Sequence, residues 1–438
     1  MATATTVKVS TDAPGIYNVG VRADSAETAS KAMQENLNKF HIYFNDQGFH
    51  NHIVHYVLTR YALGASPESI QNIFDQVSVY QRPVNPADED VVRTMADREK
   101  FKGYLEDEKH YTNFLAFFQR EIEKKGVADV LNEHLFAGDE HADDMLVRVF
   151  AGFLHPIIHL GFGLEFNQPA VVAEALAQTA IHDAWIGKLF YAAEKAAGGI
   201  GQAGTKSYVE LLDEIRADEK LSTAAHWADG NKIRDGILKR APEEMLKYAS
   251  QYKVQADQLD EKLAEMINGV AYYTGAAQHP PKQVKIDFYF MHCVNSTIFF
   301  PVFFSQPWLT TQNKVRLLEW KGRLDLAMYA SRRSPKPLID EIKNYGTPRS
   351  WKEVFDTCIE KEGGDGHVTK MARALAHGER FSKPYEAQDN FRLKGDMWLK
   401  LGNMLCDSAA NSPSDREIWV RSAGFDEAWE GMIDRANL

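Results

Sequence analysis

The 438-residue sequence predicts an all-α fold. Apolar residues recur at helical spacing from about residue 24 onward, whereas alternating strand patterns are scarce and no βαβ alternation occurs. No internal repeat with a period of about 20–50 residues is visible. No linker is long or polar enough to divide the chain. We therefore expect residues 1–23 to form an extended lead-in and residues 24–438 a single large helical domain.

Several predicted helices have recognisable ends. Ser66 and Pro67 suit the N-cap and first position of a helix ending near residue 80. A longer helix is expected from about residue 141 to 155, with Pro156 interrupting it. The apolar segment 284–304 is either one buried helix or a helix broken at Pro301. Other helices are expected at residues 24–44, 51–63, 106–125, 169–184, 189–197, 312–330, 337–344, 351–361 and 368–377, with a helical tail to 438.

Composition narrows the class of protein. The formal net charge of -11 argues against a nucleic-acid or anionic-membrane partner, because no basic stripe can neutralise phosphates. Three cysteines match neither a zinc ribbon nor a disulfide framework. The amino-terminal sequence lacks a secretory signal, and the longest apolar runs, such as STIFFPVFF, are too short to span a bilayer. These features predict a soluble, cytoplasmic protein with no membrane partner.

The stretch FLHPIIHLGFGLEF places His155 and His159 four residues apart in an apolar run. Residues at this spacing share one face of a helix, so both imidazoles point the same way. Paired imidazoles suit a transition-metal site. The alternative is a pair of hydrogen-bonded core histidines.

Three further stretches have a similar character. They are FHNHIVH, which holds His52 and His55, DFYFMHCVNST, which holds His292, and DGHVTKMARAL, which holds His367 and Lys370. Each histidine alone would read as a core residue, but together they offer ligands from facing helices, the usual way to build a buried metal site between helices. A buried lysine can also add CO₂ and become an anionic carbamate. The glycine-rich 198–204 segment follows helical sequence, so it is no dinucleotide fingerprint.

These blocks resemble the questin oxidase-like family. The most specific are HNHxxHxxLxxYALGAS and HPxxHLGxGLE, and the resemblance runs from about Phe40 to Leu405. It implies an oxygen-dependent oxidoreductase of aromatic polyketide metabolism that opens a ring of an anthraquinone-type substrate to give a benzophenone-type product. The partners would be a small aromatic substrate and O₂.

Two mechanisms are described for such proteins. One is a mononuclear non-haem Fe(II) dioxygenase, and the resemblance places its metal on His55, His155, His159, His292 and a carboxylated Lys370. The other is an NADPH-dependent Baeyer–Villiger monooxygenase. The absence of a phosphate-cradling fingerprint favours iron. NADPH could still serve to reduce the substrate, and a separate reductase is an open alternative.

The remaining residues have secondary roles in this prediction. His52 rivals His55 as a ligand, and His52 and His367 are candidates for a general base. Flat substrates stack on aromatic rings, and the rings expected to line the pocket, if they are not plain core, are Tyr56, Phe153, Phe162, Tyr289 and Phe290. A non-catalytic helical protein that binds aromatic ligands, with structural histidines, is the alternative from another class.

Overall fold

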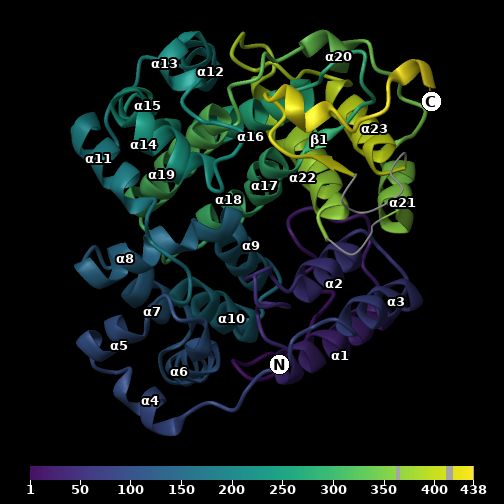
Figure 1. The fold of residues 1–438 in the computed structure, drawn as a ribbon. Helices are drawn as coiled ribbons and strands as arrows, with labels where there is room; N and C mark the ends of the chain where they lie inside the picture. The colour runs from purple at the N-terminus through teal and green to yellow at the C-terminus, as the bar shows by residue number, and fades with distance from the viewer. Residues whose placement is uncertain (362–365, 411–417, 438) are drawn as a thin grey trace. The chain divides into compact units, whose positions relative to one another are not determined.

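The computed structural model describes residues 1–361, 366–410 and 418–437, and it is built almost wholly of helices (Figure 1). This confirms the predicted all-α class. The chain groups into two compact units, which are described separately here. Unit 1 comprises residues 1–184 and 299–309, and unit 2 comprises residues 185–298 and 310–438. The segment between the predicted helices 351–361 and 368–377, which contains Gly363, Gly364 and Gly366, lies largely outside the described residues.

Unit 1 is centred on α9 and α10, which pack on each other, with α10 also covering α6 and α9 also meeting α2. Gly161 of α9 allows α18 to approach closely, since a Cβ there would lie 2.2 Å from the Phe299 ring. The helices of unit 1 are α1 (Ala23–Lys39), α2 (Ile53–Ala62), α3 (Pro67–Ser78), α4 (Glu89–Thr94), α5 (Arg98–Tyr104), η1 (Glu108–His110), α6 (Tyr111–Lys125), α7 (Val127–Leu131), η2 (Asn132–Phe136), α8 (Glu140–Val149), α9 (Ala151–Glu165), α10 (Pro169–Ala180) and α18 (Phe299–Phe304).

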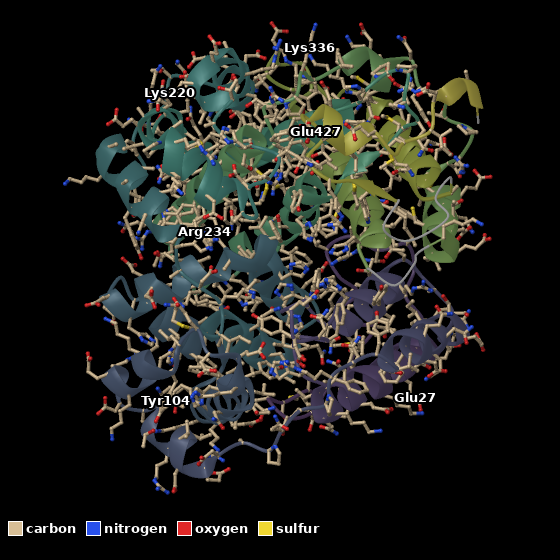
Figure 2. All side chains as sticks on the ribbon, in the orientation of Figure 1. Glu27, Tyr104, Lys220, Arg234, Lys336 and Glu427 are labelled. Atoms are coloured by element: carbon tan, nitrogen blue, oxygen red, sulfur yellow. The ribbon has the colours of Figure 1, made fainter. Side chains whose placement is uncertain are left out.

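The lead-in has neither helix nor strand before Ala23. Side chains of unit 1 hold its backbone: Val7 N donates to Gln34 Oε1 at 2.8 Å, and Ile16 N donates to Glu165 Oε1 at 2.8 Å. At the start of α3, Ser66 accepts a hydrogen bond from Ser69 N, which confirms the predicted N-cap. Charged side chains such as Glu27 of α1 lie on the exposed helix faces (Figure 2).

Unit 2 packs α16 against α17, α19 and α22, while α21 and α23 both contact α22. Its elements are α11 (Gly187–Ala197), α12 (Tyr208–Ala217), α13 (Glu219–Ser222), η3 (Lys232–Ile237), α14 (Leu238–Arg240), α15 (Pro242–Ala249), η4 (Ala256–Gln258), α16 (Leu259–Ala276), β1 (Ile286–Asp287), α17 (Phe288–Thr297), α19 (Thr311–Ser331), α20 (Ile339–Lys343), α21 (Trp351–Lys361), α22 (Val368–Ser382), η5 (Lys383–Tyr385), α23 (Met397–Ala410), β2 (Trp419–Val420), η7 (Asp426–Trp429) and η8 (Arg435–Asn437).

Two predictions about the apolar and terminal segments are corrected. The break in 284–304 falls at Ile298, between α17 and α18, and not at Pro301. Pro301 lies in the first turn of α18, where a helix does not need the missing backbone N–H. After α23 the described tail is a two-residue strand, β2, paired in parallel with β1, followed by short 3₁₀ turns, so it is not a continuous helix.

No single helix among the described residues is both long and apolar enough to cross a bilayer. Within the described part of the chain, α8 and α9 taken together reach the required length and composition, and their axes are bent by 96°. Most of α9 is buried in unit 1. The glycine-rich 198–204 segment follows α11, a helix, as expected, and therefore lacks the strand that a dinucleotide-binding loop requires.

Candidate metal centre

The turn that joins α8 to α9 is strained. Gly152, Phe153 and Leu154 have φ angles of 53°, 54° and 67°, so two residues other than glycine adopt left-handed backbone. Each such residue costs about 1–2 kcal/mol, and strain of this kind concentrates at functional sites. The prediction of one helix over 141–155 with an interruption at Pro156 is therefore wrong. The bend comes before His155, and Pro156 sits in the first regular turn, where proline is tolerated.

This turn orients the ring of His155. His155 Nδ1 lies 2.6 Å from the carbonyl oxygen of Gly152. A carbonyl oxygen can only accept, so Nδ1 carries the proton, and the lone pair of the neutral ring is on Nε2. Metal-binding histidines in proteins are commonly oriented by such a bond. Only glycine fits at position 152, because the Cβ atom of any other residue would clash with His182 Nε2 at 2.4 Å.

The start of α2 brings two further imidazoles to this ring. His52 is the N-cap residue of α2, and His55 lies one turn further on. His52 Nε2 is 2.8 Å from His155 Nε2. His55 Nε2 is 3.3 Å from Nδ1 of His159, which lies one turn after His155 on α9. The predicted shared face of His155 and His159 is therefore turned toward α2.

A buried carboxylate holds the other side of His159. His159 Nε2 lies 3.4 Å from Glu174 Oε2, on α10. Asn36 Nδ2 donates to Glu174 Oε1 at 3.3 Å, and Asn51 Nδ2 donates to Asn36 Oδ1 at 2.7 Å. This series of hydrogen bonds links α10, α1 and the residues just before α2 to the imidazole of His159. Glu174 was missed from the sequence, although it is the one charged residue in PAVVAEALAQTA.

Two more histidines extend the cluster. The His50 ring stacks on the His155 ring with centroids 3.9 Å apart and planes at 9°. His50 Nε2 is 2.9 Å from His182 Nε2, and His182 Nδ1 donates to the carbonyl of Gln178 at 2.7 Å. Burial lowers the pKa of His182 to about 4, so this ring is neutral. His182 had no sequence signal beyond a lone histidine after an apolar helix.

The donor chemistry of unit 1 fits a transition metal. Two imidazole nitrogens bound to one metal at about 2.1 Å and at right angles would lie about 3 Å apart. The nitrogen–nitrogen distances of 2.8 and 3.3 Å in unit 1 are of this size. His55, His155 and His159 are buried, and Glu174 lies where carboxylates usually orient a ligating histidine. His52 and His55 both belong to this cluster, so the geometry does not choose between them.

The predicted residues of unit 2 lie on α17 and at the start of α22. His292 Nδ1 donates to the carbonyl of Phe288 at 2.7 Å, the same arrangement that leaves Nε2 as the lone-pair nitrogen in His155. The rings of His292 and His367 are 4.6 Å apart. Lys370 lies in the first turn of α22 and is 4% exposed. Of the five predicted ligands, three therefore belong to unit 1 and two to unit 2.

The aromatic residues predicted to line a pocket fall into two groups. Tyr56, Phe162 and Phe290 are buried, and the Phe162 ring lies 5.1 Å from the His55 ring. Phe153 is 39% exposed, and Tyr289 is partly exposed. Phe153 and Tyr289 are therefore the two of the five that are not fully buried.

Comparison with known proteins agrees with the motifs. The sequence model of the questin oxidase-like family matches residues 49–375, a range that contains every predicted metal and catalytic residue. Baeyer-Villiger oxidase ptaJ of Pestalotiopsis fici is 42% identical, with 98% of both chains covered. The questin oxidase of Aspergillus terreus is 36% identical, with 99% of both chains covered. Baeyer-Villiger oxidase mdpL of Emericella nidulans is 39% identical, with 91% of both chains covered.

Proposed function

Because the chain belongs to the questin oxidase-like family, we propose that it is an oxidoreductase that opens a ring of an anthraquinone-type polyketide with O₂. The product would be a benzophenone-type compound. We propose further that it works as a mononuclear non-haem iron dioxygenase. The observation that carries this proposal is the imidazole cluster of unit 1, with nitrogens of α2 and α9 only 2.8 and 3.3 Å apart.

The iron would be held by His55, His155, His159, His292 and a carbamate on Lys370, with His52 as the rival of His55. A buried environment favours the neutral lysine amine, which combines with CO₂ to give a carbamate and one proton. Bound Fe(II) would supply a site for O₂ activation, since imidazole and carboxylate-like oxygens suit this ion. The carbamate would also contribute the negative charge that an all-histidine set lacks.

The chain's own residues prepare this site in three ways. The Gly152 carbonyl and Glu174 hold the protons of His155 Nδ1 and His159 Nε2, so the opposite nitrogens keep their lone pairs. Phe153 and Tyr289 would support a flat aromatic substrate by stacking. His52 and His367 would accept a proton from a phenolic hydroxyl of the substrate.

The Baeyer–Villiger mechanism is the alternative, and several relatives are named as Baeyer-Villiger oxidases or monooxygenases. A monooxygenase would place one atom of O₂ in the product and consume one NADPH per turnover. A dioxygenase would place both atoms of O₂ in the product. NADPH would then be needed only to reduce the substrate before ring opening, and either this protein or a separate reductase would catalyse that reduction. A non-catalytic ligand-binding role would instead leave every candidate substrate unchanged.

The test uses purified protein, a chemically pre-reduced anthraquinone and ¹⁸O₂. The proposal predicts two labelled oxygen atoms in the ring-opened product, no requirement for NADPH, and loss of activity on chelation that Fe(II) restores. One labelled atom with strict NADPH consumption would establish the monooxygenase. Full activity in metal-depleted protein would exclude the iron site.

A further inference from the structure

Arg332, directly after α19 in unit 2, is a buried cation that has no hydrogen-bonding partner among the described residues. The residue is 3% exposed, and its Nε is fully shielded. Its guanidinium forms no hydrogen bond or ion pair with any described residue. Burying an uncompensated charge costs several kcal/mol, so such groups are normally paired.

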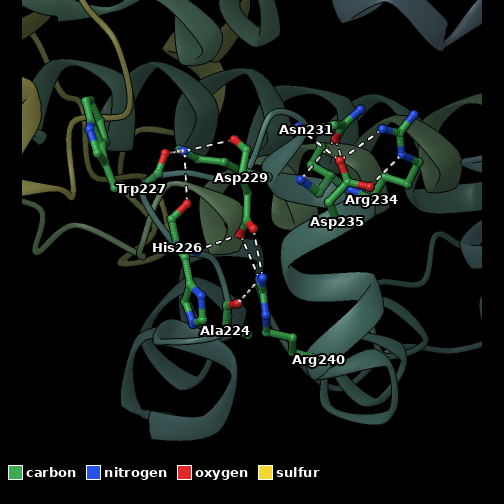
Figure 3. A network of polar contacts seen from close by, with 10 residues as sticks. Ala224, His226, Trp227, Asp229, Asn231, Arg234, Asp235 and Arg240 are labelled. Carbon is green, nitrogen blue, oxygen red and sulfur yellow. Dashed lines mark hydrogen bonds and ion pairs between the residues drawn. The ribbon is translucent and has the colours of Figure 1, made fainter.

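Other buried cations of unit 2 follow that rule. Lys232 donates to the carbonyl oxygens of His226, Trp227 and Asp229 at 3.0, 2.5 and 3.2 Å, in the loop shown in Figure 3. The partners of three more are the Ser408 carbonyl for Lys285, Asp325 for Lys321, and Glu319 for Arg323. Arg332 therefore stands apart from cations that are equally buried in the same unit.

The guanidinium of Arg332 contacts an aromatic face. Arg332 Cζ lies 3.7 Å from the centroid of the Tyr289 ring, which supplies a cation–π attraction. Asp287 contributes negative charge nearby, but its carboxylate already accepts from Tyr289 N, Phe290 N and Ala423 N at 2.8, 3.0 and 2.7 Å. Asp287 is thus committed to capping α17 and to Ala423 N, and the shielded Nε of Arg332 has no acceptor among the described residues.

The adjoining turn adds a second donor. Arg333 and Ser334 have φ angles of 65° and 42°, so the backbone after Arg332 is left-handed at two residues that are not glycine. The Ser334 hydroxyl is buried, and no described residue forms a hydrogen bond with it. A hydroxyl and a guanidinium without acceptors, two residues apart, indicate a place that an acceptor-rich group fills.

We propose that Arg332 anchors an anion-binding subsite beside Tyr289 that takes a phenolate or carboxylate oxygen of an aromatic ligand. The ligand class rests on the proposed function, while the subsite itself rests on the unpaired guanidinium. An oxyanion supplies only acceptors and matches the planar fork of arginine in bidentate geometry. It would also balance the positive charge of the guanidinium. Arg332 thereby selects ionised polyketide substrates over their neutral ethers and amides.

The test measures binding to metal-free protein, so that catalysis is not required. The probes are anthraquinone-2-carboxylate and 2-hydroxyanthraquinone, each paired with a neutral counterpart, anthraquinone-2-carboxamide and 2-methoxyanthraquinone. Dissociation constants are measured by quenching of protein fluorescence at a pH at which the hydroxyl is ionised. The two pairs show whether a carboxylate or a phenolate is the preferred oxygen.

The wild-type protein is expected to bind at least one charged probe about 10-fold more tightly than its neutral counterpart, the size expected for a charge-assisted hydrogen bond. Arg332→Met should abolish that preference and leave binding of the neutral probes within about 2-fold. Arg333→Met, which removes the adjacent exposed arginine, is the matched control and should keep the preference. Arg332→Lys should retain part of it, because the charge remains but the fork is lost.

Equal binding of charged and neutral probes by the wild-type protein, or an undiminished preference in Arg332→Met, would overturn the subsite. Thermal stability without ligand gives a second readout. Removing an unpaired buried charge should leave the melting temperature unchanged or higher, and a marked fall would show that the guanidinium has a structural role instead. Charge-dependent binding in a protein that lacks ring-opening activity would support the subsite and refute the proposed function. Ring-opening activity in a protein that binds charged and neutral probes equally would support the proposed function and refute the subsite.

Discussion

His155 Nε2 faces His52 Nε2 at 2.8 Å because a left-handed turn lets His155 bond the carbonyl of Gly152. Two independent features therefore agree on one atom: the backbone fixes the proton on Nδ1, and α2 brings a second imidazole to the nitrogen that remains. An ordinary core histidine needs only one of these. Because both features are present, a metal site explains the arrangement better than a pair of hydrogen-bonded core histidines does.

Gly152→Ala is expected to destabilise the protein and to weaken metal binding at the proposed iron site. The new methyl group would clash with the His182 ring, at 2.4 Å, in addition to the cost of about 1–2 kcal/mol for a left-handed alanine. Gly138→Ala is a matched control, since Gly138 also has positive φ but nothing lies near its Cβ position. Urea unfolding should show a larger loss for Gly152→Ala. Equal losses in the two variants would show that the approach to His182 has no energetic importance.

Glu174→Gln should weaken Fe(II) binding by about 10- to 100-fold without unfolding the protein, the usual effect of removing a carboxylate that orients a ligating histidine. Glu165→Gln, a change at a carboxylate of α9 that binds the lead-in backbone at Ile16 N, serves as the control. Competition with a coloured chelator measures the affinity. Unchanged affinity in Glu174→Gln would mean that His159 does not bind the metal through the nitrogen opposite Glu174.

Iron occupancy should depend on bicarbonate if Lys370 carries a carbamate. Protein prepared without CO₂ should bind less than one equivalent of iron and recover on addition of bicarbonate. Lys370→Ala should lose iron and show no bicarbonate response, whereas Lys370→Glu should restore part of the binding by supplying a permanent carboxylate. Full, bicarbonate-independent iron content in Lys370→Ala would remove Lys370 from the ligand set.

The stability of the fold should fall as the pH drops below about 6.5. Burial lowers the pKa of His377 to about 3, so the folded state keeps this ring neutral while the unfolded chain takes up a proton. Between about pH 6.5 and 3, each such histidine reduces stability by about 1.4 kcal/mol per pH unit. His377→Gln should flatten the decline of the urea midpoint by about one proton, and His226→Gln, which replaces a solvent-exposed ring, should not. Identical slopes would contradict the burial argument.

The features that could be predicted from the sequence were those that follow from helical periodicity and from helix-capping residues. The spacing of His155 and His159 placed both rings on one face, and Ser66 with Pro67 marked a true helix start. The break before His155 was misplaced because Phe153 and Leu154 are residue types that do not favour left-handed backbone, and only the surrounding fold holds them there. Pro156 and Pro301 were treated as breakers, although a proline in the first turn of a helix breaks nothing.

Tertiary relationships lay beyond such patterns. Glu174 reads as an isolated charge in an apolar helix, and its partner His159 becomes visible only when α10 packs on α9. Arg332 looks like any arginine at the end of a helix, because nothing in the local sequence shows that it is buried or that its donors are unmet. The family resemblance supplied the grouping of distant histidines, which spacing alone could not.

Anomalous diffraction at the iron K-edge, on crystals of protein purified with Fe(II), tests the central claim most directly. The account predicts one iron per chain, bonded to His155 Nε2 and His159 Nδ1, with His55, His292 and a carboxylated Lys370 completing its ligands. A map with no iron at these nitrogens, and with His52 and His155 joined by a simple hydrogen bond, would contradict it.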